Sequence, residues 1–316
     1  MTVKNVKKVA VIGTGTMGPG IAQVFAQHGV EVRIYDVVRE KLKEAQATLA
    51  RNLDLIFQAG LMSEADMAAT KSRIEDANSL EEAVKGVDLV IEVVPEVMDI
   101  KKGLFADLDK ICDPETILAT NTSGLSITTM AEAVSDPGRF VGMHWWNPPI
   151  IIPVIEIIKG EKTKDSVIET VDALIRQIGK VPVLVKKDVP GFLGNRLQYA
   201  LMREAIALLN DGVASAEDID TMIKAGIGFK FPVMGPLETI DMAGLDIYYP
   251  VSKYLNKDLD RSQEAAPIVA EMVEKGNLGL KSGKGFYDYT GKDIKALMGE
   301  RIKKLLVLLK DLNYVK

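Results

Sequence analysis

Cysteine and histidine are both scarce in this chain. Its 316 residues include one cysteine, Cys112, and two histidines, His28 and His144. A single cysteine excludes a disulfide framework and a cysteine-rich zinc site. Two histidines leave too few imidazole ligands for a histidine-based metal centre, so we expect no metal site.

The chain also lacks long apolar runs and a surplus of positive charge. No stretch reaches the roughly 18 uninterrupted apolar residues that a membrane-spanning helix needs, and the first apolar segment, VAVIG, is too short for a signal peptide. The formal net charge is −5, and no basic stripe is present to bind nucleic acid. We therefore expect a cytoplasmic protein that acts on a small molecule and binds neither membranes nor nucleic acid.

Length and hydrophobic pattern predict two domains. At roughly 100–200 residues per domain, 316 residues exceed one ordinary core. In the first part of the chain, short runs of valine and isoleucine alternate with amphipathic stretches, which is typical of a mostly parallel sheet covered by helices on both faces. The later part shows only helical spacing. The expected fold class is α/β, with a Rossmann-type domain at 1–187 followed by an all-α domain at 188–316.

The pattern places these elements at definite positions. The expected strands are 8–12, 32–35, 87–93, 116–119, 140–143, 154–158 and 181–185. The expected helices are 18–27, 39–58, 63–71, 166–177, 191–210, 215–225, 235–254, 266–275 and 294–312.

A glycine-rich turn follows the first expected strand. Gly13, Gly15 and Gly18 stand in G-x-G-x-x-G spacing between that strand and a helix, which is the context that a dinucleotide-binding fingerprint requires. The first two glycines permit a tight turn and close approach of a pyrophosphate, and the third permits helix–strand packing. Amide groups of the first helical turn, including that of Met17, would point at the phosphates.

The residue at the end of the second strand selects the cofactor. Asp36 stands where a carboxylate accepts hydrogen bonds from the adenosine ribose and repels a 2′-phosphate, so NAD is favoured over NADP. Arg39 is close enough in sequence to leave some NADP use open.

A histidine and a glutamate form the candidate catalytic pair. His144 ends one apolar strand, and Glu156 interrupts the next one twelve residues later. A carboxylate within an apolar run is costly to bury unless it is paired. In such a pair the carboxylate would orient the ring and stabilise its protonated form. The alternative interpretation is a structural Glu156 at the exposed end of an edge strand.

Two further polar segments lie near the expected ligand edge. Asn121 and Ser123 follow a strand at its carboxyl end, where open α/β sheets bind their ligands. Asn195 would lie one turn into a helix that starts near Pro190.

Together these segments resemble the L-3-hydroxyacyl-CoA dehydrogenase family over nearly the whole chain. The matching motifs are GTGTMG, VPE at 94–96 with Lys101 after it, NTS at 121–123, HWWNPP at 144–149, Glu156, PGFLGNR at 190–196, MGPLETIDMAGLD at 234–246 and KSGKGFYDY at 281–289.

The resemblance implies a role for each matched residue. His144 would be the catalytic acid/base with Glu156 as its partner, and Ser123 and Asn195 would hydrogen-bond the reacting oxygen. The residues expected to contact NAD, besides the glycines, are Met17, Asp36, Glu96, Lys101, Ser123 and Asn147. The implied reaction is NAD-dependent interconversion of a short-chain L-3-hydroxyacyl-CoA, such as 3-hydroxybutyryl-CoA, and its 3-keto form, as in fatty-acid β-oxidation. The helical domain would form a homodimer.

Two departures from the family pattern keep the substrate open. Trp145 and Trp146 replace the phenylalanine pair that often follows the histidine. Family members acting on CoA esters usually carry lysines in the helix-and-turn after the second strand, whereas Arg51 is the only basic residue between Ala45 and Met62. Oxidation of a free hydroxy acid of the L-gulonate or carnitine type is therefore an alternative. A non-catalytic NAD-binding protein is another.

Overall fold

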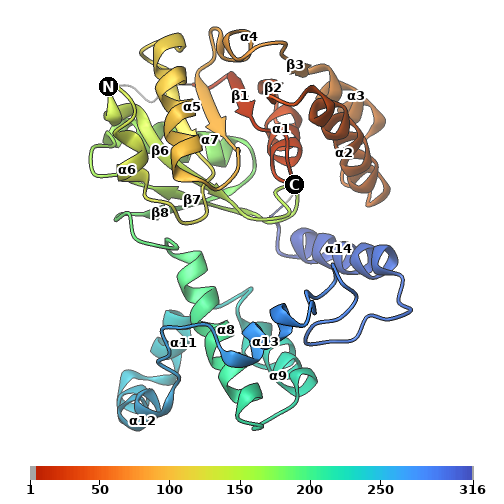
Figure 1. The fold of residues 1–316 in the computed structure, drawn as a ribbon, viewed down its shortest axis with the longest axis vertical. Helices are drawn as coiled ribbons and strands as arrows, with labels where there is room; N and C mark the ends of the chain where they lie inside the picture. The colour runs from red at the N-terminus through yellow and green to blue at the C-terminus, as the bar shows by residue number, and fades with distance from the viewer. Residues whose placement is uncertain (1–4, 315–316) are drawn as a thin grey trace. The chain divides into compact units, whose positions relative to one another are not determined.

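The computed structural model describes residues 5–314 and divides into two compact units (Figure 1). One unit holds the chain up to Asn195 and its end from Lys303, and the other is Arg196–Ile302. The boundary expected between a sheet domain at 1–187 and a helical domain at 188–316 differs from the boundaries of these units in two ways. The segment 188–195 packs with the sheet domain, and the chain returns to that unit because Leu306 and Leu309 are buried there. The division at 187 and 188 stays a prediction about domains.

The first unit is built on one eight-stranded sheet. Its strands are β1 (Lys8–Ile12), β2 (Glu31–Tyr35), β3 (Ile74–Asp76), β4 (Leu89–Glu92), β5 (Ile117–Thr120), β6 (Phe140–Trp145), β7 (Val154–Ile158) and β8 (Val181–Val185). They lie in the order β3-β2-β1-β4-β5-β6-β7-β8. Neighbours are parallel except β6 and β7, which are antiparallel. The first six follow the order of a dinucleotide-binding sheet, which confirms the predicted fold class.

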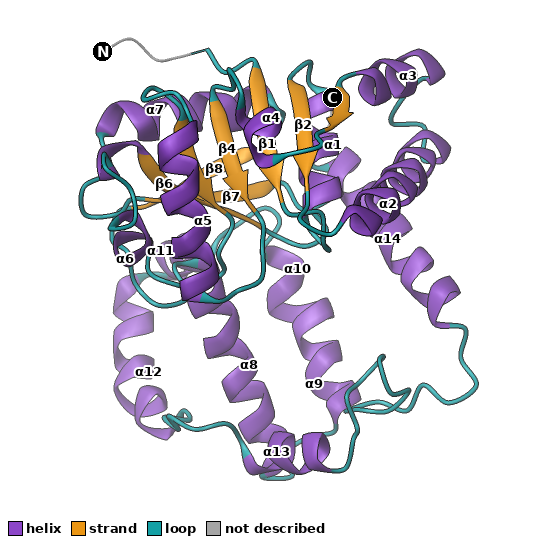
Figure 2. Ribbon diagram, turned by 45° about the horizontal axis from the view of Figure 1, so that its top comes forward, coloured by secondary structure: helices purple, strands orange, loops and turns teal. Residues whose placement is uncertain are grey.

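Helices cover both faces of this sheet (Figure 2). The helices of this part are α1 (Gly18–Gln27), α2 (Arg39–Gln58), α3 (Glu64–Ser72), α4 (Leu80–Val84), α5 (Met98–Ile111), α6 (Ile127–Ala131), the short η1 (Pro137–Arg139) and α7 (Asp165–Gln177). One buried cluster joins the sheet to α1, α2 and α7, and a second joins its other face to α4, α5 and α6. Burial on both faces explains why the strands read as nearly continuous apolar runs.

The rest of the chain is helical, as expected. Its helices are α8 (Gly194–Asn210), α9 (Ala216–Met222), η2 (Ile223–Ile227), α10 (Gly228–Lys230), α11 (Pro236–Ala243), α12 (Leu245–Asp258), α13 (Pro267–Glu274) and α14 (Ile294–Asp311). The single helix expected at 235–254 is interrupted, because Gly244 adopts φ +96° between α11 and α12. No helix among residues 5–314 is long and apolar enough to cross a lipid bilayer.

The second unit buries none of its residues. Every residue from Arg196 to Ile302 is described, and each is at least partly exposed. Large apolar side chains such as Phe229 and Leu237 are both 76% exposed. An exposed apolar surface of this extent is typical of an interaction surface.

Candidate active site

The glycine-rich turn between β1 and α1 has the geometry of a dinucleotide site. Gly13 adopts φ +105°, and a Cβ there would lie 2.6 Å from the carbonyl oxygen of Val93. A Cβ on Gly18 would collide with the carbonyl oxygen of Gly13. No atom lies within 4 Å of a Cβ built on Gly15, so a ligand can approach the backbone there. Met17, the N-cap of α1, caps no amide with its side chain, which leaves the helix N–H groups for a phosphate.

Asp36 is held beside this turn. Its Oδ2 accepts hydrogen bonds from the backbone N–H and the hydroxyl of Thr14 (2.8 and 3.1 Å), and its Oδ1 accepts one from the N–H of Val38 (3.0 Å). Arg39 donates to Asn78 Oδ1 (2.7 Å). The carboxylate is therefore fixed at the end of β2, where a ribose would lie, and these residues fit NAD.

His144 and Glu156 form a buried pair across β6 and β7. The two residues are directly opposite in the antiparallel register, and His144 Nδ1 lies 2.7 Å from Glu156 Oε2. They are 3% and 2% exposed. Since β7 is flanked by β6 and β8, the alternative of an exposed Glu156 on an edge strand is wrong.

The start of the segment after β8 completes the surroundings of Glu156. The backbone N–H groups of Leu193 and Gly194 donate to its Oε1 (3.1 and 2.9 Å), and Trp146 Nε1 donates to its Oε2 (3.3 Å). Burial alone would raise the pKa of Glu156, but the hydrogen bonds and charge of His144 and the two N–H groups outweigh it and lower the pKa. An ionised carboxylate is therefore available to stabilise an imidazolium.

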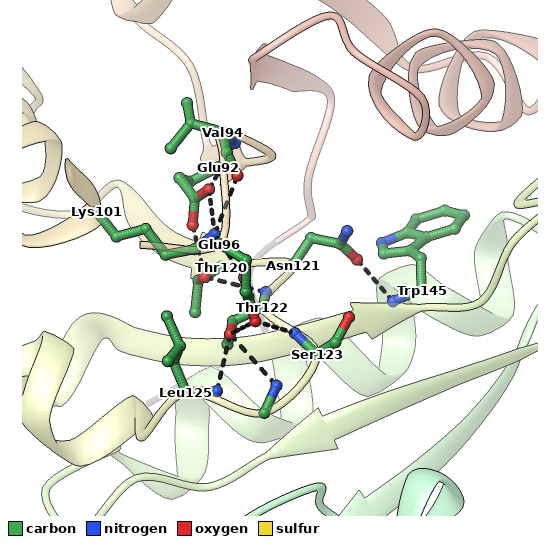
Figure 3. Close-up of polar contacts among 11 residues, drawn as sticks. Glu92, Val94, Glu96, Lys101, Thr120, Asn121, Thr122, Ser123, Leu125 and Trp145 are labelled. Carbon is green, nitrogen blue, oxygen red and sulfur yellow. Dashed lines mark hydrogen bonds and ion pairs between the residues drawn. The ribbon is translucent and has the colours of Figure 1, made fainter. Parts of the chain in front are cut away.

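The loops after β4 and β5 meet through a polar network (Figure 3). Glu96 Oε1 accepts hydrogen bonds from the hydroxyl of Thr122 (2.5 Å) and the N–H of Ser123 (2.8 Å). Asn121 Oδ1 accepts from the N–H of Trp145 (2.8 Å), which ties this loop to β6 beside the histidine. The carboxyl ends of β4, β5 and β6 therefore converge on one edge of the sheet.

Two more of the predicted site residues are asparagines. Asn195 Nδ2 donates to the carbonyl oxygen of Ser123 (2.9 Å). Asn147 follows Trp146 and precedes a cis peptide bond to Pro148.

Lys101, which the resemblance led us to expect at NAD, is a buried side chain beside the loop after β4. Its side chain is 1% exposed, and its Nζ lies 2.6 Å from Glu92 Oε1. Sequence reasoning missed Glu92, although a lone carboxylate within the run LVIEVV is the same signal that drew attention to Glu156.

The two family models that match the chain cover both halves. The NAD-binding domain of 3-hydroxyacyl-CoA dehydrogenase matches residues 8–189, and the C-terminal domain of that enzyme matches residues 191–289. The chain belongs to the 3-hydroxyacyl-CoA dehydrogenase family. As a member of this family it is an NAD-dependent oxidoreductase.

Similar family members act on different kinds of substrate. A 5-formyl-3-hydroxy-2-methylpyridine 4-carboxylate 5-dehydrogenase of Mesorhizobium japonicum is 44% identical over 303 residues, 96% of this chain and 97% of its own. A 3-hydroxybutyryl-CoA dehydrogenase of Clostridioides difficile is 39% identical over 283 residues, 89% of this chain and 99% of its own.

Solved structures show the same division. That of the 5-formyl-3-hydroxy-2-methylpyridine 4-carboxylic acid 5-dehydrogenase, an NAD⁺-dependent dismutase, has a TM-score of 0.91 at 43% identity and covers 98% of this chain and 99% of its own. That of (S)-3-hydroxybutyryl-CoA dehydrogenase from Ralstonia eutropha has a TM-score of 0.75 at 37% identity and covers 90% and 99%.

Proposed function

We propose that this family member oxidises a hydroxyl-bearing carbon, with His144 as the acid/base. The observation that carries the proposal is the buried 2.7 Å contact between His144 Nδ1 and Glu156 Oε2. Because Glu156 occupies Nδ1, Nε2 is the nitrogen that can take the hydroxyl proton. NAD, held at the glycine-rich turn and Asp36, would supply the hydride acceptor when bound.

The remaining polar groups place the reacting oxygen and the cofactor. We assign Ser123 and Asn195 to the oxygen, because they are joined by a 2.9 Å hydrogen bond at the edge where β5 ends. Donors aimed at that oxygen stabilise the charge that develops on it. We assign Gly13, Gly15, Met17, Gly18 and Asp36 to the adenosine and pyrophosphate half of NAD, and Glu96, Ser123 and Asn147 to its other half.

For the substrate we propose a small free carboxylic acid bearing an oxidisable hydroxyl or formyl group. The support is the extent of the match to the pyridine carboxylate dehydrogenase, which covers 96% of this chain against 89% for the butyryl-CoA enzyme. A formyl group presents a hydroxyl once water has added, so the same base serves both groups.

The surface after the second strand supports this choice. Ile56, Leu61 and Met62, at the end of α2 and the turn after it, line the same cavity of about 770 Å³ as Leu306 and Leu309 of α14. The stretch that carries lysines in members acting on CoA esters here contributes apolar side chains to this cavity, and the basic side chains that also line it, Arg73, Arg176 and Lys180, come from other segments. A CoA moiety carries several phosphate charges, which favour cationic partners.

A short-chain L-3-hydroxyacyl-CoA is the second candidate. It is favoured by the 3-hydroxybutyryl-CoA dehydrogenases that are 38–39% identical over about nine-tenths of the chain. Lys41 and Lys43, at the start of α2, are the cations that could meet the phosphates.

A comparison of kcat/KM between substrates decides between these candidates. NADH formation is measured with 3-hydroxybutyryl-CoA, with 3-hydroxybutyrate, and with a panel of aliphatic and aromatic hydroxy and formyl acids. We expect the highest kcat/KM with a free acid. A higher value with the CoA ester establishes the second candidate. NAD binding without turnover of any of these compounds would indicate a non-catalytic NAD-binding protein.

We also propose that the second unit forms a homodimer. The basis is the absence of any buried residue from Arg196 to Ile302, all of which are described. Light scattering after gel filtration should give about twice the chain mass of 34.5 kDa. A mass equal to one chain would contradict the proposal.

A further inference from the structure

Glu92 is the most completely enclosed carboxylate at the ligand edge of the sheet. It ends β4, lies between β1 and β5, and is 0% exposed. Its Oε1 accepts hydrogen bonds from the N–H of Val94 and from Lys101 Nζ, both at 2.6 Å, and its Oε2 accepts one from the hydroxyl of Thr120 at 2.6 Å. The donors to Glu92 in Figure 3 therefore come from the loop after β4, from the helix α5 that follows it and from the last residue of β5.

Lys101 also contacts a second carboxylate, that of Glu96. Its Nζ lies 3.3 Å from Glu96 Oε2 and also donates to the carbonyl oxygen of Val94 (3.3 Å). The side chain of Lys101 is 1% exposed, whereas that of Glu96 is 44% exposed. Glu96 can therefore meet a ligand directly, and Lys101 is enclosed between the two carboxylates.

The same Glu96 sets the position of the loop after β5. Its other oxygen accepts from the N–H of Ser123 (2.8 Å), and Thr122 also donates to it (2.5 Å). A continuous series of charged contacts thus runs from Glu92 to Ser123: a hydrogen bond joins Glu92 to Lys101, an ion pair joins Lys101 to Glu96, and a hydrogen bond joins Glu96 to Ser123. Charge-assisted hydrogen bonds are short, directional and about twice as strong as neutral ones.

We propose that Glu92 is a positioning residue for the nicotinamide half of NAD, acting through Lys101 on Glu96 and Ser123. The inference rests on the proposed function, which puts that half of the cofactor at Glu96 and Ser123. Lys101 is then an internal counter-charge and makes no direct contact with NAD. Without Glu92, Glu96 would be the carboxylate left to pair with Lys101 Nζ among the ion pairs of the described residues, and it would be drawn away from Ser123.

Ligands that differ only in the nicotinamide test this assignment. NADH and ADP-ribose share the adenosine and pyrophosphate, which bind at the glycine turn and Asp36. In Glu92→Gln we expect the Kd for NADH to rise roughly tenfold, as one lost charge-assisted bond implies, and the Kd for ADP-ribose to change less than about twofold. The KM for NAD should rise in parallel. The matched control is Glu132→Gln, which removes the partner of Lys102, the neighbouring lysine of α5, from a more exposed pair.

A second variant keeps the test valid if Glu92→Gln folds poorly. The double variant Glu92→Gln with Lys101→Met removes both buried charges and so leaves neither unpaired. It should still lose NADH affinity selectively, because Glu96 has lost its tether. Equal losses of NADH and ADP-ribose affinity, or a lower Tm with unchanged NADH affinity, would show that the pair is only structural.

These binding measurements need no substrate. Failure of the proposed function would appear as absent turnover, whereas failure of the positioning role would appear as unselective or unchanged binding.

Discussion

Two strands of the sheet carry a buried glutamate beside a basic side chain, and the two pairs behave differently. Glu156 in β7 lies 2.7 Å from His144, and Glu92 in β4 lies 2.6 Å from Lys101. The pKa of Glu156 is lowered, because the hydrogen bonds and charge of its partners outweigh burial. The pKa of Glu92 is raised, because desolvation outweighs the attraction of Lys101 and the surrounding hydrogen bonds.

The difference teaches that burial and pairing do not by themselves mark a catalytic carboxylate. The identity of the basic partner matters, because histidine exchanges a proton near neutral pH and lysine does not. The backbone matters too, since Glu156 receives two N–H groups from Leu193 and Gly194, whereas Glu92 receives one from Val94. We therefore assign the first pair to proton transfer and the second to positioning.

Among the variants that test this comparison, removal of His144 should produce the largest loss of activity. We expect His144→Ala to lower kcat by roughly 10²- to 10⁴-fold with little change in NAD affinity, because a positioned acid/base is lost. Steady-state kinetics and NADH titration measure both quantities. His28→Ala is the matched control, since His28 lies at the end of α1 with its Nδ1 near the carbonyl oxygen of Val24. Similar losses in both variants would refute the assignment.

Removal of the charge on Glu156 should give the next largest effect. A hydrogen bond to a charged group is worth about 1.5–3 kcal/mol, so Glu156→Gln should lower kcat roughly 10- to 100-fold. The acidic limb of the pH–rate profile for oxidation should move to lower pH, because the imidazolium loses its stabilising charge. Glu92→Gln should leave that limb in place. A shift of the limb in Glu92→Gln as well would remove the distinction between the pairs.

Much of the fold could be predicted because local patterns specify it. Continuous apolar runs predicted seven strands close to their observed positions, whereas β3 was missed because its three residues, Ile74–Asp76, are mostly exposed and polar. The glycine fingerprint and its helix follow from backbone conformations that only neighbouring residues determine. The return of the chain at Lys303 depends on packing between distant segments, which periodicity cannot show.

In the candidate site, too, features set by local sequence could be predicted and features set by distant packing could not. The pairing of His144 with Glu156 could be predicted because the two lie on successive strands of suitable spacing. The burial of Lys101 could not, because its exposure depends on the direction of α5 and on Glu92, whose significance appears only when β4 is flanked by β1 and β5. A motif match predicts that a residue matters there, and only the structure distinguishes a ligand contact from a group acting through its neighbour.

A third carboxylate, that of Asp36, can be compared with the two buried glutamates. Asp36 is partly exposed and accepts hydrogen bonds from neutral donors of Thr14 and Val38. Asp36→Ala should weaken NAD binding roughly tenfold, because one charge-assisted hydrogen bond to the ribose is lost. It should also reduce the preference of the protein for NAD over NADP, because the carboxylate no longer repels a 2′-phosphate. Titration with both cofactors measures this, with Glu31→Gln at the exposed start of β2 as the control. An unchanged preference would mean that another residue reads the ribose.

The smallest expected effect is the pH dependence of stability, where the two buried pairs should differ in sign. The lowered pKa of Glu156 means that its ionisation stabilises the fold above about pH 4.3, the unfolded value, and that this contribution is lost as the pH falls through the folded value. The raised pKa of Glu92 means that its contribution is present below about pH 4.3 and is lost as the pH rises through the folded value.

Differences in Tm between wild type and each variant, measured as a function of pH, isolate these contributions. The advantage of wild type over Glu156→Gln should shrink on acidification, and its advantage over Glu92→Gln should shrink as the pH rises from about 4.3. The sign of each slope is therefore the quantity that tests the comparison. Slopes of equal sign would mean that the two carboxylates share one electrostatic environment, and the separation of a proton-transfer pair from a positioning pair would then have to rest on kinetics alone.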